Sequence, residues 1–379
     1  MKYICEFYIP VENNEERYYA ISACDKATYL FSVLNRLGYD VEVISPSYSK
    51  KRSKQRIDRL NNKVTITSGF SLGWNGRITK FFAKLSTMVW LLFFLLFKCK
   101  KGELVIVYHH VHYVPWLLIA MFFKRLRFIL EVEEIYSALE MKSGLSWRSI
   151  LEKSIIHNAY RFIFASSQLE KKCNSAMRKP FVVATGSYIV PNHLGEKIKD
   201  DKIHAVYAGL IEKDKVAFRS ANIAKYLDAK YMIHIIGYGK DSDIDALNKM
   251  IDEINKTSDC KVRFDGLKRG DDYIRYLQSC HIGLCPLSTN IEYQKACFPS
   301  KITSYLSNGL FVVTTTNEVL KTSSYKDYLY FVKDNTPKEF AQAIKGISLN
   351  LKPNPCDCII KEDKRMLQEF PNLFGCNEK

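Results

Sequence analysis

The sequence lacks the features that define several classes of protein. Its eleven cysteines show no paired short spacing except Cys356 and Cys358, and no second pair or histidine cluster accompanies these two to complete a metal site. We therefore expect reduced and mostly packed thiols, as in a protein of the cytosolic side. The first ten residues contain Glu6 and no apolar core typical of a signal peptide, so we expect a first strand there.

Uncharged runs long enough to span a bilayer are also lacking. The run in the most apolar stretch, Leu85–Phe97, has 13 residues, too few for a spanning helix. Basic residues bracket it on both sides, and a second apolar stretch with a basic end follows at 116–127. Segment 77–127 is therefore predicted to lie on an anionic membrane surface. The alternative, helices buried between a sheet and its neighbours, stays open.

Acidic residues are scarce in one part of the chain. The whole sequence has a net charge of +16, and residues 50–101 hold thirteen Lys or Arg residues against one acid, Asp58. Such an excess attracts nucleic acid, an anionic membrane surface or phosphorylated substrates. No zinc finger, aromatic RNA-binding motif or basic heptad accompanies the charge, so we expect no nucleic-acid partner.

What the sequence does contain is a regular alternation of short apolar runs and helical patterns. The runs predict strands at 2–9, 40–45, 103–108, 127–132 and 161–166, and again at 204–209, 231–237, 262–266, 282–287 and 310–315. Strands that alternate with helices predict parallel sheets covered on both faces. A chain of 379 residues is long enough for two such domains.

The two blocks of strands are separated by a polar stretch at 190–202 that contains Pro and Gly and is a predicted hinge. We expect an α/β protein with a first Rossmann-like domain at 1–190 and a second at 200–355, and residues 356–379 are expected to pack back on the first domain. Ligands bind beyond the carboxyl ends of such strands, so the expected site is a cleft between the domains.

The second half resembles a known family. The segments Y-A-G at 207–209, I-I-G-Y-G at 235–239, V-R-F-D-G at 262–266 and H-I-G-L-C-P-L at 281–287 precede F-P-S-K-I-T-S-Y-L-S-N-G-L-F-V-V at 298–313. In this order and spacing they are similar to the GT-B-fold glycosyltransferases of bacterial polysaccharide synthesis, of the glycosyltransferase 4 type. The resemblance implies two Rossmann-like domains that face each other across a cleft. It also implies a nucleotide-sugar donor, expected to be a UDP-sugar, on the second domain, an acceptor on the first, and no cofactor.

The resemblance implies that two glycines and two lysines bind the donor. Gly209 and Gly237 end strands where the backbone passes close to a ligand, and Tyr238 follows the second of them. Lys213 and Lys215 lie in the loop after Gly209, from which such enzymes aim a basic residue at the donor diphosphate. The glycines could equally mark tight turns.

The Pro-Ser-Lys segment predicts an anion site. Pro299 and Ser300 can begin a helix, because Pro fits the first turn and Ser can cap it. The free N–H groups and dipole of this helix suit a diphosphate, and Lys301 adds a full positive charge. The alternative is a capped helix with a solvated lysine.

The same segment departs from the family. Many relatives carry two glutamates eight positions apart here, and this chain has Ala296 and Ser304 at those positions. Ser304 is expected to contact the donor by a hydrogen bond weaker than that of a carboxylate. Glu292, which lies nearby in the sequence, is the alternative source of the missing carboxylate. The identity of the donor and the stereochemical course therefore stay open.

Acids and histidines in the first half are the candidates for acceptor chemistry. Glu133 and Glu134 follow an apolar strand and are candidate general bases, Glu134 being the better match to the family's acid. They could instead be a solvated cluster or ion-pair partners. His110 and His112 follow another strand at strand-like spacing, which puts them on one face as acceptor-binding residues or as structural ones. We expect no metal site, because the acids of D-S-D-I-D at 241–245 suit a helix start.

These observations predict a metal-independent glycosyltransferase, of hexosyltransferase type, at the inner face of the cell membrane. It would transfer a sugar from a nucleotide-sugar donor to a lipid-linked saccharide for capsule, exopolysaccharide or O-antigen. The rival hypotheses are a GT-B-fold epimerase or phosphorylase, and a catalytically degenerate scaffold of a polysaccharide assembly complex.

Overall fold

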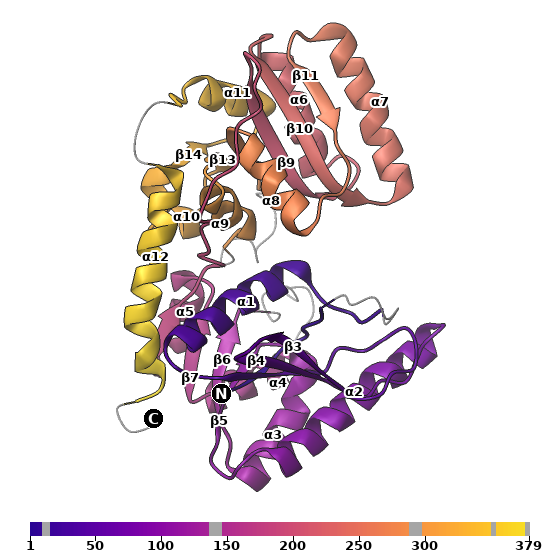
Figure 1. Ribbon diagram of the computed structural model, residues 1–379, viewed down its shortest axis with the longest axis vertical. Coiled ribbons are helices and arrows are strands. Elements are labelled where there is room, and N and C mark those ends of the chain that lie inside the picture. Colours follow the sequence, from indigo (N-terminus) through magenta and orange to yellow (C-terminus); the bar gives the residue numbers. More distant parts are fainter. Residues whose placement is uncertain (10–15, 136–145, 288–297, 350–353, 376–379) are drawn as a thin grey trace. The chain divides into compact units, whose positions relative to one another are not determined.

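A computed structural model describes residues 1–9, 16–135, 146–287, 298–349 and 354–375. The chain divides into two compact units (Figure 1). Unit 1 comprises Met1–Ser187 and Arg365–Lys379, and unit 2 comprises Tyr188–Lys364.

Unit 1 contains an eight-stranded sheet in the order β3-β4-β2-β1-β5-β6-β7-β8. Its strands are β1 (Lys2–Ile4), β2 (Val41–Ser45), β3 (Arg56–Asn61), β4 (Val64–Ser68), β5 (Leu104–Tyr108), β6 (Arg127–Val132), β7 (Arg161–Phe164) and β8 (Phe181–Val183). All neighbouring pairs are parallel except β3 and β4, which form an antiparallel hairpin at the edge. The five strands predicted for this half are confirmed, and the hairpin and β8 are additional.

Helices connect the strands of unit 1, as the predicted alternation of strands and helices requires. They are α1 (Ile21–Arg36), α2 (Arg77–Lys98), the 3₁₀ helix η1 (Val111–Tyr113), α3 (Val114–Lys124), α4 (Trp147–Asn158), α5 (Ser167–Asn174) and, near the end of the chain, η6 (Phe370–Leu373). Gly38, which follows α1, has a φ of +89°, a conformation that a residue with a side chain rarely adopts. Glycine at this position therefore lets the chain turn away at the end of the helix.

Helix α2 is longer than the apolar run that marks it in the sequence. It has 22 residues, because the basic residues before Leu85 continue the same helix. Within the described ranges it is the one helix with the length and composition to cross a membrane. A third of its most apolar window is buried in the protein, and a single helix of this kind is weak evidence for a span.

Unit 2 contains a fully parallel six-stranded sheet in the order β11-β10-β9-β12-β13-β14. Its strands are β9 (Ile203–Ile211), β10 (Tyr231–Gly239), β11 (Lys261–Phe264), β12 (Ile282–Cys285), β13 (Phe311–Thr315) and β14 (Leu329–Val332). The first five were predicted and are confirmed. Only β14 is additional.

Helices cover both faces of this sheet. They are α6 (Val216–Asn222), η3 (Ile223–Tyr226), α7 (Asp241–Thr257), α8 (Gly270–Ser279), α9 (Ser300–Ser307), α10 (Glu318–Lys321), η5 (Lys326–Tyr328) and α11 (Pro337–Lys345). Helix α12 (Pro355–Glu369) begins in unit 2 and ends in unit 1. Ile233 and Ile235 of β10 pack in one buried cluster with residues of α6, α7 and α11. His234, between them, bonds to Tyr276 of α8 on the opposite face. Each unit is thus a Rossmann-like α/β layer structure, and the predicted fold class is confirmed.

The segments at the borders of the units have defined contacts. In unit 2, the Gly195 N–H donates to Gln278 Oε1 at 2.9 Å and Lys197 Nζ donates to the carbonyl of Cys280 at 2.6 Å, so this part of the predicted hinge is tied to the end of α8. In unit 1, Arg365 donates to the carbonyl of Val183 at 2.7 Å, and Phe374 packs on Tyr39 with ring centroids 4.9 Å apart. The last described residues, through Phe374, are therefore part of the fold of unit 1.

Candidate functional site

Two glycines let the ends of β9 and β10 approach closely. Gly209 and Gly237 are paired across the two strands. A Cβ on Gly237 would overlap the carbonyl oxygen of Gly209, so only glycine fits at position 237. The result is an edge of bare backbone at the carboxyl ends of two central strands, where parallel sheets bind ligands.

The side chain of Lys301 crosses this edge. A Cβ on Gly209 would lie 2.6 Å from Cε and 2.7 Å from Nζ of Lys301. The ammonium also lies 5.0 Å from the centroid of the Tyr207 ring, a cation–π arrangement. In the described part of the chain Lys301 has no hydrogen bond or ion pair, so its charge is available to an anion. We call Gly209, Gly237, Lys301 and the first turn of α9 the Lys301 site.

Helix α9 begins one residue earlier than the capping prediction requires. Pro299 is the N-cap, Ser300 is the first helical residue, and no side chain caps the helix. The prediction that Ser300 caps the helix is therefore wrong. Proline has no hydroxyl to bond the first-turn N–H groups, and these stay without a side-chain partner next to Lys301. This arrangement favours an anion at the helix start.

Tyr305 anchors this helix and was not anticipated from the sequence. It is fully buried, its hydroxyl accepts a hydrogen bond from the Ala208 N–H at 2.9 Å, and it donates to the carbonyl of Leu284. Its ring packs over Gly283, where a Cβ would collide with it. Two features of the sequence could have indicated this contact: an aromatic residue in the helix and a glycine within a predicted strand. Tyr305 fixes α9, and hence Lys301, relative to β9.

The hydroxyl of Ser304 has a hydrogen-bond partner within the protein. Its hydroxyl lies 3.2 Å from the hydroxyl of Tyr273 on α8. A tyrosine thus supports the position at which many relatives have a glutamate. Ala296 and Glu292, the other positions of this comparison, lie outside the described residues.

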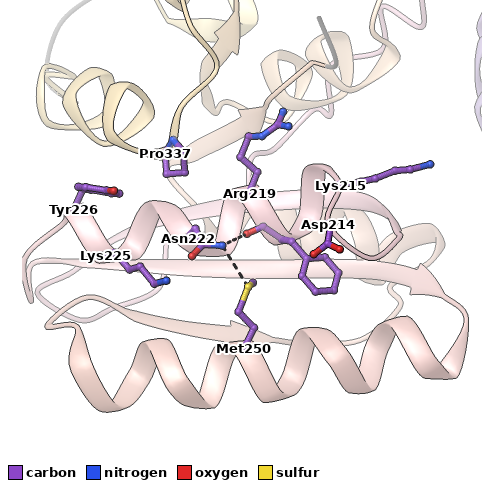
Figure 2. Close-up of a pocket in the computed structure, with 9 residues that line it drawn as sticks. Asp214, Lys215, Arg219, Asn222, Lys225, Tyr226, Met250 and Pro337 are labelled. Carbon is purple, nitrogen blue, oxygen red and sulfur yellow. Dashed lines mark hydrogen bonds between the residues drawn. The ribbon is translucent and has the colours of Figure 1, made fainter. Parts of the chain in front are cut away.

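Within the described residues, neither Lys213 nor Lys215 makes a contact that places it beside Lys301. Lys213 is exposed, and Lys215 pairs with Glu212 at 2.9 Å. Lys215 lines a separate cavity of about 360 Å³ between α6, η3, α7 and α11. Figure 2 shows its side chain extending away from Arg219, while Asn222 bonds to Met250 across the cavity. Tyr238 is half exposed at the end of β10.

In unit 1, Glu131 near the end of β6 and Glu133 just after it are already paired. Lys26 of α1, which is buried, lies 3.3 Å from Glu131 and forms a shorter ion pair with Glu133. Tyr3 donates its hydroxyl proton to Glu131. Burial raises the pKa of Glu133 to about 7, although Lys26 opposes this. A carboxylate that shares a buried ammonium is poorly placed to accept a substrate proton, so Glu133 is the weaker of the two candidate bases.

Lys26 was also not anticipated. It falls on the face of α1 that carries Leu30 and Val33, both buried. The available signal was a lysine within the apolar stripe of a helix, because a lysine that is buried there needs an acid as its partner.

Glu134 lines a second cavity, of about 200 Å³, at the carboxyl ends of β1, β5 and β6. We call it the Glu6 cavity. Its lining residues are Cys5, Glu6, Tyr18, Ala20, Ala23, Tyr108, His110, Tyr113 and Glu134. The backbone oxygen of Glu134 lies 3.3 Å from Nδ1 of His109. Two residues predicted for acceptor chemistry, Glu134 and His110, thus line one cavity.

The two histidines lie together, but for a different reason than predicted. Strand β5 ends at Tyr108, and His112 lies in the 3₁₀ helix η1, so the prediction of strand-like alternation is wrong. The chain turns after the strand, and the ring centroids of His110 and His112 lie 5.0 Å apart. Burial lowers the pKa of His110 to about 3, so its imidazole is neutral near pH 7. Where the structure describes the chain, no three His, Cys, Asp or Glu residues are grouped to hold a metal ion.

Comparison with known proteins concerns the family and the fold. Residues 202–350 match the family described as glycosyl transferases group 1. No curated protein sequence matches the chain. Among solved structures, a sucrose-phosphate synthase from Thermosynechococcus elongatus is similar, with a TM-score of 0.69 at 12% identity over 98% of both chains.

Two further structures are similar over nearly the whole chain. Anabaena HepE in complex with UDP and glucose has a TM-score of 0.65 at 10% identity, covering 98% of both chains. An α,α-trehalose-phosphate synthase (UDP-forming) from Burkholderia vietnamiensis has a TM-score of 0.64 at 9% identity, covering 98% of this chain and 97% of its own. The predicted resemblance and the GT-B fold are confirmed.

Proposed function

We propose that this chain, a glycosyltransferase by the family match of its second unit, transfers a sugar from a UDP-sugar to a lipid-linked saccharide at an anionic membrane surface. The reaction would serve the synthesis of capsule, exopolysaccharide or O-antigen. The enzyme would act at the cytoplasmic face of the cell membrane as a peripheral protein.

The donor part of the proposal rests on the unpaired charge of Lys301. A leaving diphosphate needs positive charge and N–H donors where negative charge develops. Lys301 and the uncapped start of α9 provide both beside the bare backbone of Gly209. This is a metal-independent way to stabilise the leaving group. The UDP in the HepE structure supports a UDP-sugar as the donor.

The acceptor part rests on an apolar surface of unit 1, which we call the apolar face. It comprises the exposed side chains Ile78, Phe81, Phe82, Phe93 and Phe97 of α2 and Ile119, Phe122 and Phe123 of α3. The two helices lie side by side (Figure 1). Phe97 and Phe122 are 74% and 79% exposed, unusual values for large apolar side chains gathered on one surface.

Basic residues flank this apolar face where the two helices end. Lys98, Lys100, Lys101 and Arg125 are exposed there. The Gly102 N–H donates to the carbonyl of Lys124 at 2.8 Å, which joins the two chain segments. Apolar side chains with a basic rim suit the headgroup region of an anionic leaflet. Six residues of α2 are buried in unit 1, so a helix that keeps them packed lies along the membrane rather than across it.

Transfer assays test this function. The purified chain is incubated with a panel of radiolabelled nucleotide sugars and a membrane extract of the source organism. We expect label to move from a UDP-sugar into lipid-extractable product. No turnover with any donor, together with no nucleotide binding, would remove the proposal and favour a catalytically degenerate scaffold. Conversion of the sugar without any acceptor would favour an epimerase.

A further inference from the structure

The Glu6 cavity contains one acid whose role is unassigned. Glu6 follows β1, is half buried, and lines the cavity together with His110 and Glu134. Within the described ranges its carboxyl group has no hydrogen bond and no ion pair. This sets Glu6 apart from Glu131 and Glu133, whose carboxylates are held by Tyr3 and Lys26.

The size and lining of the cavity suit a sugar. At about 200 Å³ it is smaller than the pockets of about 300–1,000 Å³ that hold drug-sized ligands, so it fits a single sugar residue. Tyr18, Tyr108 and Tyr113 contribute aromatic side chains to the lining, and Tyr18 is itself stacked on Tyr48 at 5.2 Å. Aromatic faces bind the apolar faces of a sugar ring, whereas carboxylates accept hydrogen bonds from its hydroxyls.

The electrostatic surroundings leave Glu6 able to change charge near neutral pH. Burial raises the pKa of Glu6 to about 7, and Lys84 of α2 is the charge that opposes this. Cys5, Cys24 of α1 and Tyr48 interact with Glu6 and are uncharged at this pH, because burial raises the pKa of each. His110 is neutral, as argued above, and Glu134 is the remaining acid of the lining. Above pH 7 Glu6 therefore presents a negative charge to the cavity.

We propose that the Glu6 cavity binds the sugar end of the acceptor and that the carboxylate of Glu6 accepts a hydrogen bond from one of its hydroxyls. The proposal rests on the proposed function, because it concerns the acceptor of that transfer. It makes Glu6 an acceptor-binding residue rather than a donor-binding one. The acceptor must then carry a free sugar hydroxyl, which a bare lipid phosphate lacks.

Replacement of the carboxylate tests this role. Glu6→Gln keeps the shape of the side chain and removes its charge. We expect the concentration of membrane extract that gives half the maximal rate to rise about tenfold at pH 8, because a hydrogen bond to a charged group is lost. The KM of the UDP-sugar should not change. In the wild-type protein, acceptor affinity should fall as the pH drops through about 7, and this dependence should vanish in Glu6→Gln.

Two further variants keep the test decisive. Glu42→Gln removes a carboxyl from the neighbouring strand β2, outside the cavity, and should behave as wild type. Ala23→Leu fills the cavity from α1 and should weaken the acceptor alone. If Glu6→Gln fails to fold, as thermal melting would show, Ala23→Leu carries the test.

The possible failures are distinguishable. A wild-type protein that transfers no sugar overturns the proposed function, and this inference falls with it. Transfer that is intact in wild type and equally intact in Glu6→Gln, with the same pH profile and acceptor affinity, overturns the role of Glu6 alone. Unchanged acceptor affinity in Ala23→Leu overturns the placement of the acceptor.

Discussion

The two units hold charge in opposite ways. In unit 2, a single cation, Lys301, lies over bare backbone with no carboxylate partner in the described residues. In unit 1, Glu131 and Glu133 share the ammonium of Lys26, whereas Glu6 has no such partner within the described residues. Each candidate site thus presents a charged group of one sign, Lys301 in unit 2 and Glu6 in unit 1, that no described residue neutralises. A cation suits a diphosphate, whereas a carboxylate suits sugar hydroxyls.

The Lys301 site and the Glu6 cavity also differ in whether main chain or side chains form them. The Lys301 site depends on main chain that only glycine permits and on a helix start, so it tolerates few substitutions. The Glu6 cavity and the apolar face depend on side chains from several elements, which can be exchanged without changing the path of the backbone. The following variants break or sharpen this comparison.

The largest loss of stability is expected in unit 2, where the strands β9 and β10 approach closely at two glycines. Gly237→Ala places a methyl group against the carbonyl of Gly209, at a φ of +150° that other residues rarely adopt. We expect a loss of about 2–4 kcal/mol, seen as a clear fall in Tm, because two central strands must separate. Gly346→Ala at the end of α11 has ordinary helical φ and space for a methyl group, so its Tm should stay within a few degrees of wild type. Equal Tm values for the two variants would contradict this account.

A smaller effect is expected from the charge of the same site. Lys301→Met keeps the aliphatic stem over Tyr207 and removes the ammonium. The rate of sugar transfer at low donor concentration should fall about 10- to 100-fold, since a hydrogen bond to a charged group contributes about 1.5–3 kcal/mol. Lys249→Met, on the exposed side of α7, serves as the control and should transfer normally. Unimpaired transfer by Lys301→Met would show that another group holds the diphosphate.

The smallest effect is expected from the apolar face of unit 1. The double variant Phe122→Ser/Phe123→Ser removes two exposed rings without opening the core. Binding to vesicles of anionic phospholipid, measured by sedimentation, should weaken about tenfold, because less apolar surface enters the headgroup region. Ile274→Ser on α8 of unit 2 removes a partly exposed apolar residue outside the apolar face and should bind as wild type. Vesicle binding that is equal in both variants, or insensitive to salt, would place the membrane contact elsewhere.

The predictable parts of the molecule are those with local signals. Apolar runs predicted ten of the strands, and the glycines near the ends of β9 and β10 marked the edge at which Lys301 lies. The edge hairpin β3–β4 was missed, although R-I-D-R-L-N and V-T-I-T-S alternate as strands do, because the charge of this region dominated its interpretation. Strands β8 and β14 were also missed, β8 being only three residues long.

The parts that could not be predicted depend on contacts between distant residues. Nothing near Glu133 in the sequence indicates that Lys26, 107 positions away, neutralises it. The bond between Tyr305 and Ala208 spans 97 positions and is likewise invisible locally. Glu6 interrupts an apolar strand pattern, which is a signal, but its role depends on the cavity that α1 and β5 form around it. A one-dimensional pattern identifies which residues are unusual, whereas the fold decides which of them remain unpaired.

The most direct test of the account is a calorimetric titration of the full-length protein with UDP in the presence of EDTA. We predict saturable binding to one site that does not require a metal ion and is at least tenfold weaker in Lys301→Met. No binding of UDP, binding abolished by EDTA, or equal affinity in the two proteins would contradict the claim that Lys301 and the start of α9 hold the donor diphosphate.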